Sequence, residues 1–302
     1  MAELTILRPR LREVGGSEVR RALPSAKRRT VGPFVFFDHF GPEDLEPFEL
    51  RDVRPHPHIG LSTVTYLFEG VSVHRDSIGS VQTIEPGAVN WMTAGRGIAH
   101  SERAPAKLAG SPRRTHGLQL WTGLPRTLEE SPPAFAHTPS ADIPMLERDR
   151  ARVRLLVGRA WGAESPVAAS SETLYLDIAL PAGGLLDIPP LTAERALYGV
   201  DAAFEIDGQE VEPFVMAVLE AGASVRVTSR APARIVLIGG EPLDGPRFIW
   251  WNYVSSRRER IVEAAEQWSR DHLPRIPGEM DWIDLPDKPN FLGDVHHERE
   301  IP

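Results

Sequence analysis

The sequence predicts an all-β fold in two halves, with a helix near the C-terminus. Across the 302 residues, short runs rich in β-branched and aromatic side chains alternate with turns that contain glycine or proline. The same pattern recurs on both sides of a proline-rich stretch in the middle of the chain. Many short strands with little helix are typical of a β-sandwich or a β-barrel.

The composition excludes several classes of function. A formal net charge of −8 argues against a broad nucleic-acid-binding surface, which would be basic. The chain has no cysteine, which excludes disulfides, thiolate metal ligands and a cysteine nucleophile. No apolar run reaches the about 18 residues of a membrane-spanning helix, and the N-terminus lacks a signal-peptide pattern. We therefore expect a cytoplasmic protein that binds neither membranes nor nucleic acid directly.

Five strands are expected in the first half after His58. Their β-branched and aromatic residues alternate, and turns such as Glu69-Gly70 and Glu85-Pro86-Gly87 separate them. The expected strands cover residues 62–68, 71–76, 81–84, 89–93 and 115–121. Together they predict one β domain within residues 1–135.

A proline-rich stretch from Glu130 to Pro144 is expected to be a surface linker between the halves. The second domain would then cover residues 136–302. This half has no histidine between Ala141 and Asp271. We therefore expect it to hold no copy of any histidine metal site in the first half.

Strands are also expected along the second half. Residues 172–180 alternate, with leucine or isoleucine at every second position on one face. Residues 204–211 predict a hairpin around Asp207-Gly208, a pair that favours the tight turns of two-residue loops. Residues 225–228 and 233–238 predict two more strands.

A helix is expected to follow these strands. Ser256 and Glu259 have the spacing of a capping box, and Ile261, Ala265 and Trp268 can line one helical face. Its expected role is to pack across a barrel. The tail beyond it contains His296-His297, which is better explained as a solvated extension than as a metal site.

Two short motifs predict a metal site. His56 and His58 are two residues apart, as are His100 and Glu102, and residues so spaced on a strand point to the same face. Pro57 favours extended backbone at His56 and suits the rim of a sheet. If the two segments face each other, they form a site of three histidines and one carboxylate. Imidazole and carboxylate ligands without thiolate suit Fe(II), Mn(II), Ni(II), Cu(II) or Zn(II).

Other histidines fit structural roles better. A hydrogen bond to Asp76 is the expected role of His74, although His74 is also a candidate ligand. For His39 we expect a hydrogen-bonded position in the core. His116 and Gln119 fall on opposite faces of one strand, so at most one of them can line a cavity.

Several motifs across nearly the whole chain resemble the pirin family of the cupin superfamily. The resemblance implies two tandem antiparallel β-barrels, a bicupin, with residues 1–135 as the metal-binding barrel and residues 136–302 as a barrel without metal ligands plus the helix and tail. It also implies one metal, usually iron, on His56, His58, His100 and Glu102. The matching segments are GPFVFFDHFGP (32–42), HPHIG (56–60), TVTYLFEG (63–70), NWMTAGRGIAHSE (90–102), HGLQLW (116–121) and FIWWNYVSSRRERI (248–261).

The resemblance also implies an activity. Pirins are known for the oxygen-dependent cleavage of the flavonol quercetin, which makes a small phenolic substrate and O2 the expected partners and Glu102 a candidate base. The alternative is a metal- or redox-responsive regulatory protein that acts through a protein partner. One departure is visible at Ser62, where many pirins have glutamate. Strand alternation predicts that Ser62 shares the face of His58.

Overall fold

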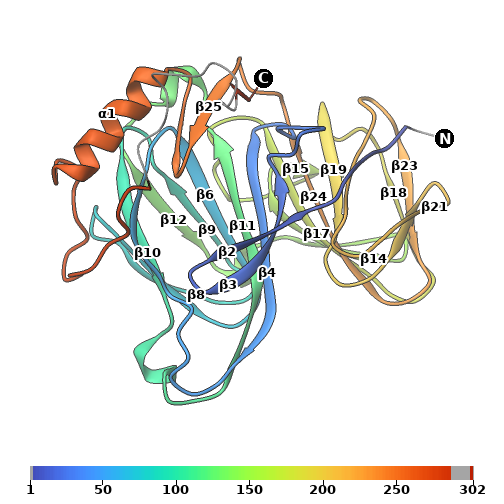
Figure 1. The fold of residues 1–302 in the computed structure, drawn as a ribbon. Helices are drawn as coiled ribbons and strands as arrows, with labels where there is room; N and C mark the ends of the chain where they lie inside the picture. Colours follow the sequence, from blue (N-terminus) through green and yellow to red (C-terminus); the bar gives the residue numbers. More distant parts are fainter. Residues whose placement is uncertain (1–2, 287–299, 302) are drawn as a thin grey trace. The chain divides into compact units, whose positions relative to one another are not determined.

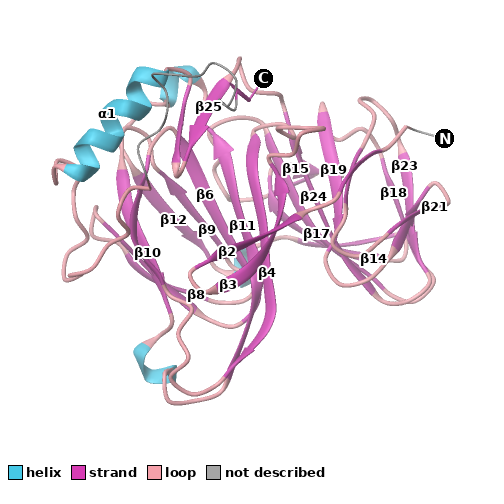
Figure 2. Cartoon of the chain, in the orientation of Figure 1, coloured by secondary structure: helices cyan, strands magenta, loops and turns pink. Residues whose placement is uncertain are grey.

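The computed structural model describes residues 3–286 and 300–301. Within these residues, strands predominate, and the helical elements are one α-helix, α1 (Arg258–Ser269), and three short 3-10 turns (Figure 2). The all-β prediction with a short C-terminal helix is confirmed. None of the helices in these residues is long and apolar enough to cross a membrane. The 3-10 turns are η1 (Ala106–Leu108), η2 (Arg126–Leu128) and η3 (Ser140–Asp142).

The chain forms two compact units that each draw on more than one stretch of sequence. The first comprises Met1–Leu11, Arg20–Phe37 and Ala141–Pro242. The second comprises Arg12–Val19, Asp38–Ser140 and Leu243–Pro302. The domain boundary expected between residues 135 and 136 stays a prediction.

The first unit contains sheets of seven, four and two strands. The sheet of seven has the order β1 (Thr5–Leu7), β22 (Met216–Val218), β19 (Glu194–Gly199), β24 (Ala233–Gly240), β17 (Thr173–Leu180), β14 (Ala151–Val157), β13 (Met145–Arg148). The sheet of four has the order β18 (Gly184–Ile188), β23 (Val225–Ser229), β20 (Phe204–Ile206), β21 (Gln209–Val211). The remaining pair is β15 (Arg159–Ala160) and β16 (Ala163–Glu164).

Apolar side chains form a continuous core in the first unit. The alternating face predicted for residues 172–180 is confirmed, because Leu174, Leu176, Ile178 and Leu180 all lie in this core. The predicted hairpin is confirmed as β20 and β21. Its turn residues Asp207 and Gly208 have φ of 50° and 82°, the positive values that two-residue hairpin turns require. The expectation that this half holds no metal stays a prediction.

The second unit carries the strands of the predicted metal motifs. Its sheet of four has the order β5 (Val53–His58), β10 (Ile98–Arg103), β7 (Ser72–Asp76), β8 (Val81–Ile84). A sheet of seven has the order β12 (Ala134–Thr138), β9 (Val89–Thr93), β6 (Leu61–Glu69), β11 (Arg113–Gly123), β4 (Phe34–Leu45), β3 (Ser17–Leu23), β2 (Arg10–Val14). Of these strands, β12, β9, β6 and β11 lie wholly in the second unit. A small sheet has the order β26 (Tyr253–Ser255), β25 (Arg247–Trp250), β27 (Glu300–Ile301).

The proline-rich stretch contains a strand that the surface-linker prediction did not include. Its residues 134–138 form β12, which pairs antiparallel with β9 at the edge of the large sheet. The two prolines at 132 and 133 come just before this strand, so they remove none of its hydrogen bonds. A strand of five residues between prolines gives only a weak sequence signal, so the prolines dominated the prediction for this stretch.

Helix α1 packs with the face that the sequence predicts. The helix is drawn in orange in Figure 1. Ile261 and Ala265 lie in a buried cluster with Ile59 and Tyr253, and Trp268 lies in a second cluster. The predicted capping box is wrong: Arg257 is the N-cap residue and makes no side-chain capping bond. The hydroxyl of Ser256 instead bonds the Glu129 carboxylate at 2.9 Å. The histidine pair expected in the tail, His296-His297, lies outside the described residues.

Candidate metal centre

The two predicted metal motifs lie on adjacent antiparallel strands. In the pairing of β5 with β10, His100 lies directly opposite His56, and Ile98 lies opposite His58. The register shifts between His100 and Glu102, where three residues of β5 span two residues of β10. Pro55 lies within this irregularity, and a proline donates no ladder hydrogen bond.

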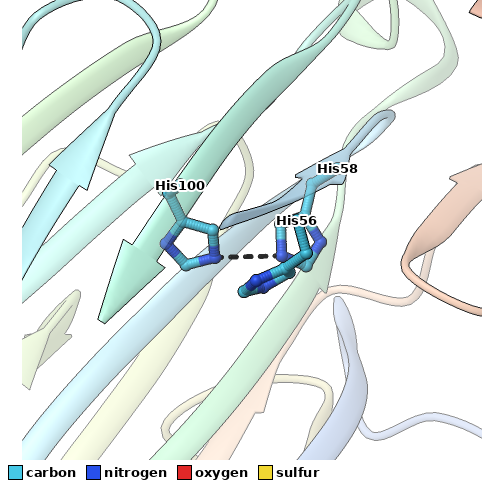
Figure 3. Close-up of side chains that lie close together, drawn as sticks. All are labelled: His56, His58 and His100. Atoms are coloured by element: carbon cyan, nitrogen blue, oxygen red, sulfur yellow. Dashed lines mark hydrogen bonds between the residues drawn. The ribbon is translucent and has the colours of Figure 1, made fainter. Parts of the chain in front are cut away.

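Three imidazoles converge in the second unit (Figure 3). His56, His58 and His100 each offer a ring nitrogen, and these nitrogens all lie within 4.8 Å of one another. The Nε2 atoms of His58 and His100 are 3.1 Å apart. All three side chains are buried. Spacing alone related His56 to His58 but could not relate either of them to His100. The structure brings all three histidines together.

Backbone carbonyls fix two of the three rings. Nδ1 of His56 donates to the carbonyl of Arg54 at 2.8 Å, and Nδ1 of His58 donates to the carbonyl of Asn252 at 3.0 Å. A carbonyl can only accept, so each Nδ1 carries the proton and each Nε2 keeps its lone pair. Metal-binding histidines are oriented in this way by a partner of the second nitrogen.

Burial keeps the rings neutral. It lowers the pKa of His56 to about 4, and it lowers the pKa values of His58 and His100 well below their usual range. At neutral pH the nitrogen lone pairs are therefore available to a cation. Two imidazole nitrogens bound to one ion at about 2.1 Å lie about 3 Å apart when they meet it at a right angle. The 3.1 Å separation of His58 and His100 fits a small divalent metal.

Glu102 stands apart from this group of nitrogens. Its Oε1 accepts a hydrogen bond of 2.7 Å from Thr65, and the same hydroxyl lies 2.8 Å from Oε1 of Gln119. The pKa of the Glu102 carboxyl is raised, because the effect of burial exceeds the opposing effect of the hydrogen bond from Thr65. Alternation along β10 gives Glu102 the face of His100. Its role as fourth ligand stays a prediction.

The expectation for Ser62 is wrong. Its hydroxyl lies 3.1 Å from that of Thr93 on the neighbouring strand. Thr65, which contacts Glu102, is an odd number of residues away on β6 and so faces the opposite side. Strand alternation does not carry from His58 to Ser62 because the chain turns between them, at Gly60 with φ of 67°.

The other histidines take the structural roles expected of them. His74 bonds Asp76 at 2.9 Å, which confirms that prediction. His39 is fully buried, with its Nε2 2.7 Å from Nε2 of His116. Gln119, and not His116, contacts the Thr65 hydroxyl beside Glu102.

Sequence reasoning missed the groups that hold the ligands. The carbonyl of Asn252 anchors His58 from 194 positions along the chain, and no spacing rule relates such distant residues. The only signal was the segment 248–261 among the family motifs. Thr65 lies in another family motif, residues 63–70, but its residue type gave no signal, because a threonine on a strand is common.

Known proteins resemble this chain over nearly its whole length. The family model for pirin matches residues 16–122, and the model for the pirin C-terminal cupin domain matches residues 175–274. The chain belongs to the pirin family. A pirin-like protein of Caulobacter vibrioides is 44% identical over 283 residues, which cover 92% of this chain and 97% of the relative.

Two further relatives of this pirin carry a named activity. A candidate quercetin 2,3-dioxygenase of Pseudomonas aeruginosa is 37% identical, over 84% of this chain and 79% of the relative. The crystal structure of a quercetin 2,3-dioxygenase from Acinetobacter baumannii superposes with a TM-score of 0.90 at 34% identity. That match covers 99% of this chain and 98% of the other. The predicted fold of two cupin domains is thereby confirmed.

Proposed function

We propose that this pirin is an Fe(II)-dependent dioxygenase that cleaves a flavonol such as quercetin with O2. The observation that carries the proposal is the convergence of three buried, neutral imidazoles in one cupin unit. The two relatives named for quercetin 2,3-dioxygenase activity support the choice of substrate class.

The chain's own residues would hold the metal. Nε2 of His56, His58 and His100 would be ligands. We assign the fourth position to a carboxylate oxygen of Glu102, two residues from His100 on β10. When bound, a divalent ion supplies Lewis-acid polarisation of a substrate oxygen and a template for substrate and O2. The donor set without thiolate is compatible with iron and with other transition metals.

Glu102 is the residue that we assign to proton transfer. A carboxyl whose pKa is raised by burial is a stronger base than an exposed one, so it can take the proton of a phenolic hydroxyl. Thr65 donates to Oε1, and Oε2 would accept this proton when Glu102 is only loosely bound to the metal. Trp121 packs edge-on to His58, with ring centroids 5.2 Å apart, and excludes water from that side of the imidazoles.

The proposal is tested by loading metal-free protein with Fe(II) under nitrogen and adding quercetin and O2. We expect quercetin absorbance to fall with repeated turnover and His58→Ala protein to show none. Full Fe(II) occupancy without turnover above that variant would contradict the dioxygenase and favour the regulatory alternative. Elemental analysis after anaerobic purification identifies the resident metal.

A further inference from the structure

A buried carboxylate and a fourth histidine lie behind His100. Nε2 of His74 is 2.9 Å from Oδ2 of Asp76, and Nδ1 of His74 is 3.4 Å from Nδ1 of His100. The residues lie on the paired strands β7 and β10, where His100 is directly opposite Asp76. All three residues are at most 2% exposed. They form a continuous chain of contacts that ends at a predicted metal ligand.

Neither Asp76 nor His74 is free to turn. Oδ1 of Asp76 accepts the backbone N–H groups of Ile78 at 3.1 Å and Ser80 at 2.9 Å, so its other oxygen must face His74. The ring of His74 stacks on Phe135 with 4.3 Å between centroids and 16° between planes. The contact chain is therefore held from both its carboxylate end and its side.

The direction of each hydrogen bond follows from the Asp76 end. A carboxylate accepts, so Nε2 of His74 must donate to it. A neutral His74 then has its lone pair on Nδ1 and can only accept at that atom. The facing Nδ1 of His100 must donate, which leaves the lone pair of His100 on Nε2.

We propose that Asp76 and His74 are positioning residues that hold His100 in the tautomer with its proton on Nδ1. The choice matters because Nε2 of His100 is 3.1 Å from Nε2 of His58, which carries a lone pair. In the other tautomer, His100 would donate to His58 and place a proton where the metal binds. The chain of contacts keeps this gap available to a cation.

The inference rests on the metal site of the proposed function but not on the dioxygenase reaction. Its sharpest test is Asp76→Asn, which keeps the shape of the side chain. The two backbone N–H groups retain the amide oxygen, so the amide nitrogen faces Nε2 of His74. Two donors cannot pair, so His74 moves its proton to Nδ1 and His100 moves its proton to Nε2. The same exchange in a Ser-His-Asp triad puts the histidine in the wrong tautomer.

Two readouts follow from this substitution. Zn(II) affinity, measured by competition with a chelator, should fall by about 10–100-fold, the usual loss for groups that orient a ligand. In metal-free protein, ¹⁵N NMR should show the His100 proton on Nδ1 in the wild type and on Nε2 in Asp76→Asn, with His100→Ala used to assign the resonance. A role in stability alone would not move this proton.

Two substitutions of His74 separate its contacts. Asparagine can place an amide oxygen where Nδ1 lies and so keep an acceptor for His100. Glutamine can place its amide nitrogen where Nε2 lies and so keep only the bond to Asp76. We expect His74→Asn to retain near-wild-type Zn(II) affinity and His74→Gln to lose about 10–100-fold. If Asp76→Asn fails to fold, the two His74 variants still test whether the contact at Nδ1 of His74 orients His100.

A matched control is Asp177→Asn in the first unit, another buried aspartate with a charged partner, Arg234. It should lower stability and leave Zn(II) affinity unchanged. Wild-type affinity in Asp76→Asn, with the His100 proton still on Nδ1, would overturn the proposal, as would equal affinities of the two His74 variants. If the wild type binds no metal, the proposed function is wrong. The NMR measurement then still shows which tautomer of His100 is present.

Discussion

At the scale of single residues, the site depends on which nitrogen of each imidazole is engaged. The carbonyls of Arg54 and Asn252 occupy Nδ1 of His56 and His58, so both rings present Nε2 to the same point. The i, i+2 spacing predicted that the two residues of each motif point to the same face of their strand. This part of the site could be predicted from the sequence, because strand geometry alone determines it. Which nitrogen points inward depends on partners that spacing does not identify.

Substituting Glu102 by glutamine separates metal binding from chemistry. The change keeps an oxygen for the metal but removes the charge and the base, so bound Fe(II) should persist while quercetin turnover falls by about 10²-fold or more. The measurements are metal content and initial rate. Glu69→Gln, at an exposed carboxylate that ends β6, should change neither. Unchanged turnover in Glu102→Gln would exclude Glu102 as the base.

At the scale of elements, a tight turn connects a ligand to its anchor. Gly60 follows the ligand strand with φ of 67°, and a Cβ atom there would lie 2.0 Å from the carbonyl oxygen of Val254. Val254 lies two residues beyond Asn252, whose carbonyl holds His58. The turn therefore fixes how the ligand strand meets the segment that orients it.

Gly60→Ala should consequently lower both stability and metal affinity. The substituted side chain meets backbone, which cannot move aside cheaply, and left-handed backbone costs a further about 1–2 kcal/mol. Gly222→Ala is the matched control, because Gly222 has φ of 74° but no atom within 4 Å of a Cβ. Urea unfolding and Zn(II) titration should show a smaller stability loss and normal affinity for the control. Equal effects of the two would refute a role for the turn at Gly60.

Helix α1 gives a second prediction at this scale. Ile261 is fully buried in the helix face against Tyr253, whereas its neighbour Val262 is 37% exposed. Ile261→Ala should lower the free energy of unfolding by about 2–5 kcal/mol through lost burial and the cavity left behind. Val262→Ala should lower it by no more than about 0.5 kcal/mol. Urea unfolding compares the two, and similar losses would show that the helix does not pack through this face.

The elements also show where sequence patterns stop being informative. Strands such as β8 and β9 begin and end where their residues predict, because alternation and turn residues agree. The capping box at Ser256 fails because a tertiary partner, the carboxylate of Glu129, takes the hydroxyl. Glu129 is itself buried beside Arg247, whose Nε lies 2.7 Å from it, and nothing local predicts that pair.

At the scale of the whole molecule, the two cupin domains were predictable but the course of the chain through the compact units was not. The family motifs and the repeated strand pattern predict two all-β halves. The compact units, however, interleave the sequence: Leu243–Pro302 belongs with Asp38–Ser140, and Arg20–Phe37 belongs with Ala141–Pro242. This interleaving depends on long-range pairings, which leave no periodic signal. It also explains how Asn252 comes to anchor a ligand on β5.

Metal binding to metal-free protein, measured by calorimetry and elemental analysis, decides whether the three histidines form a metal site. We expect one divalent ion per chain, because the described residues hold one group of three converging ligand side chains and the second half lacks histidines over residues 142–270. His56→Ala, His58→Ala and His100→Ala should each weaken binding by more than the about 10–100-fold typical of groups behind a ligand. His137→Ala, whose ring bonds Asn90, should bind normally. Full occupancy in His100→Ala, or a second ion located in the first unit, would contradict this assignment of the metal ligands.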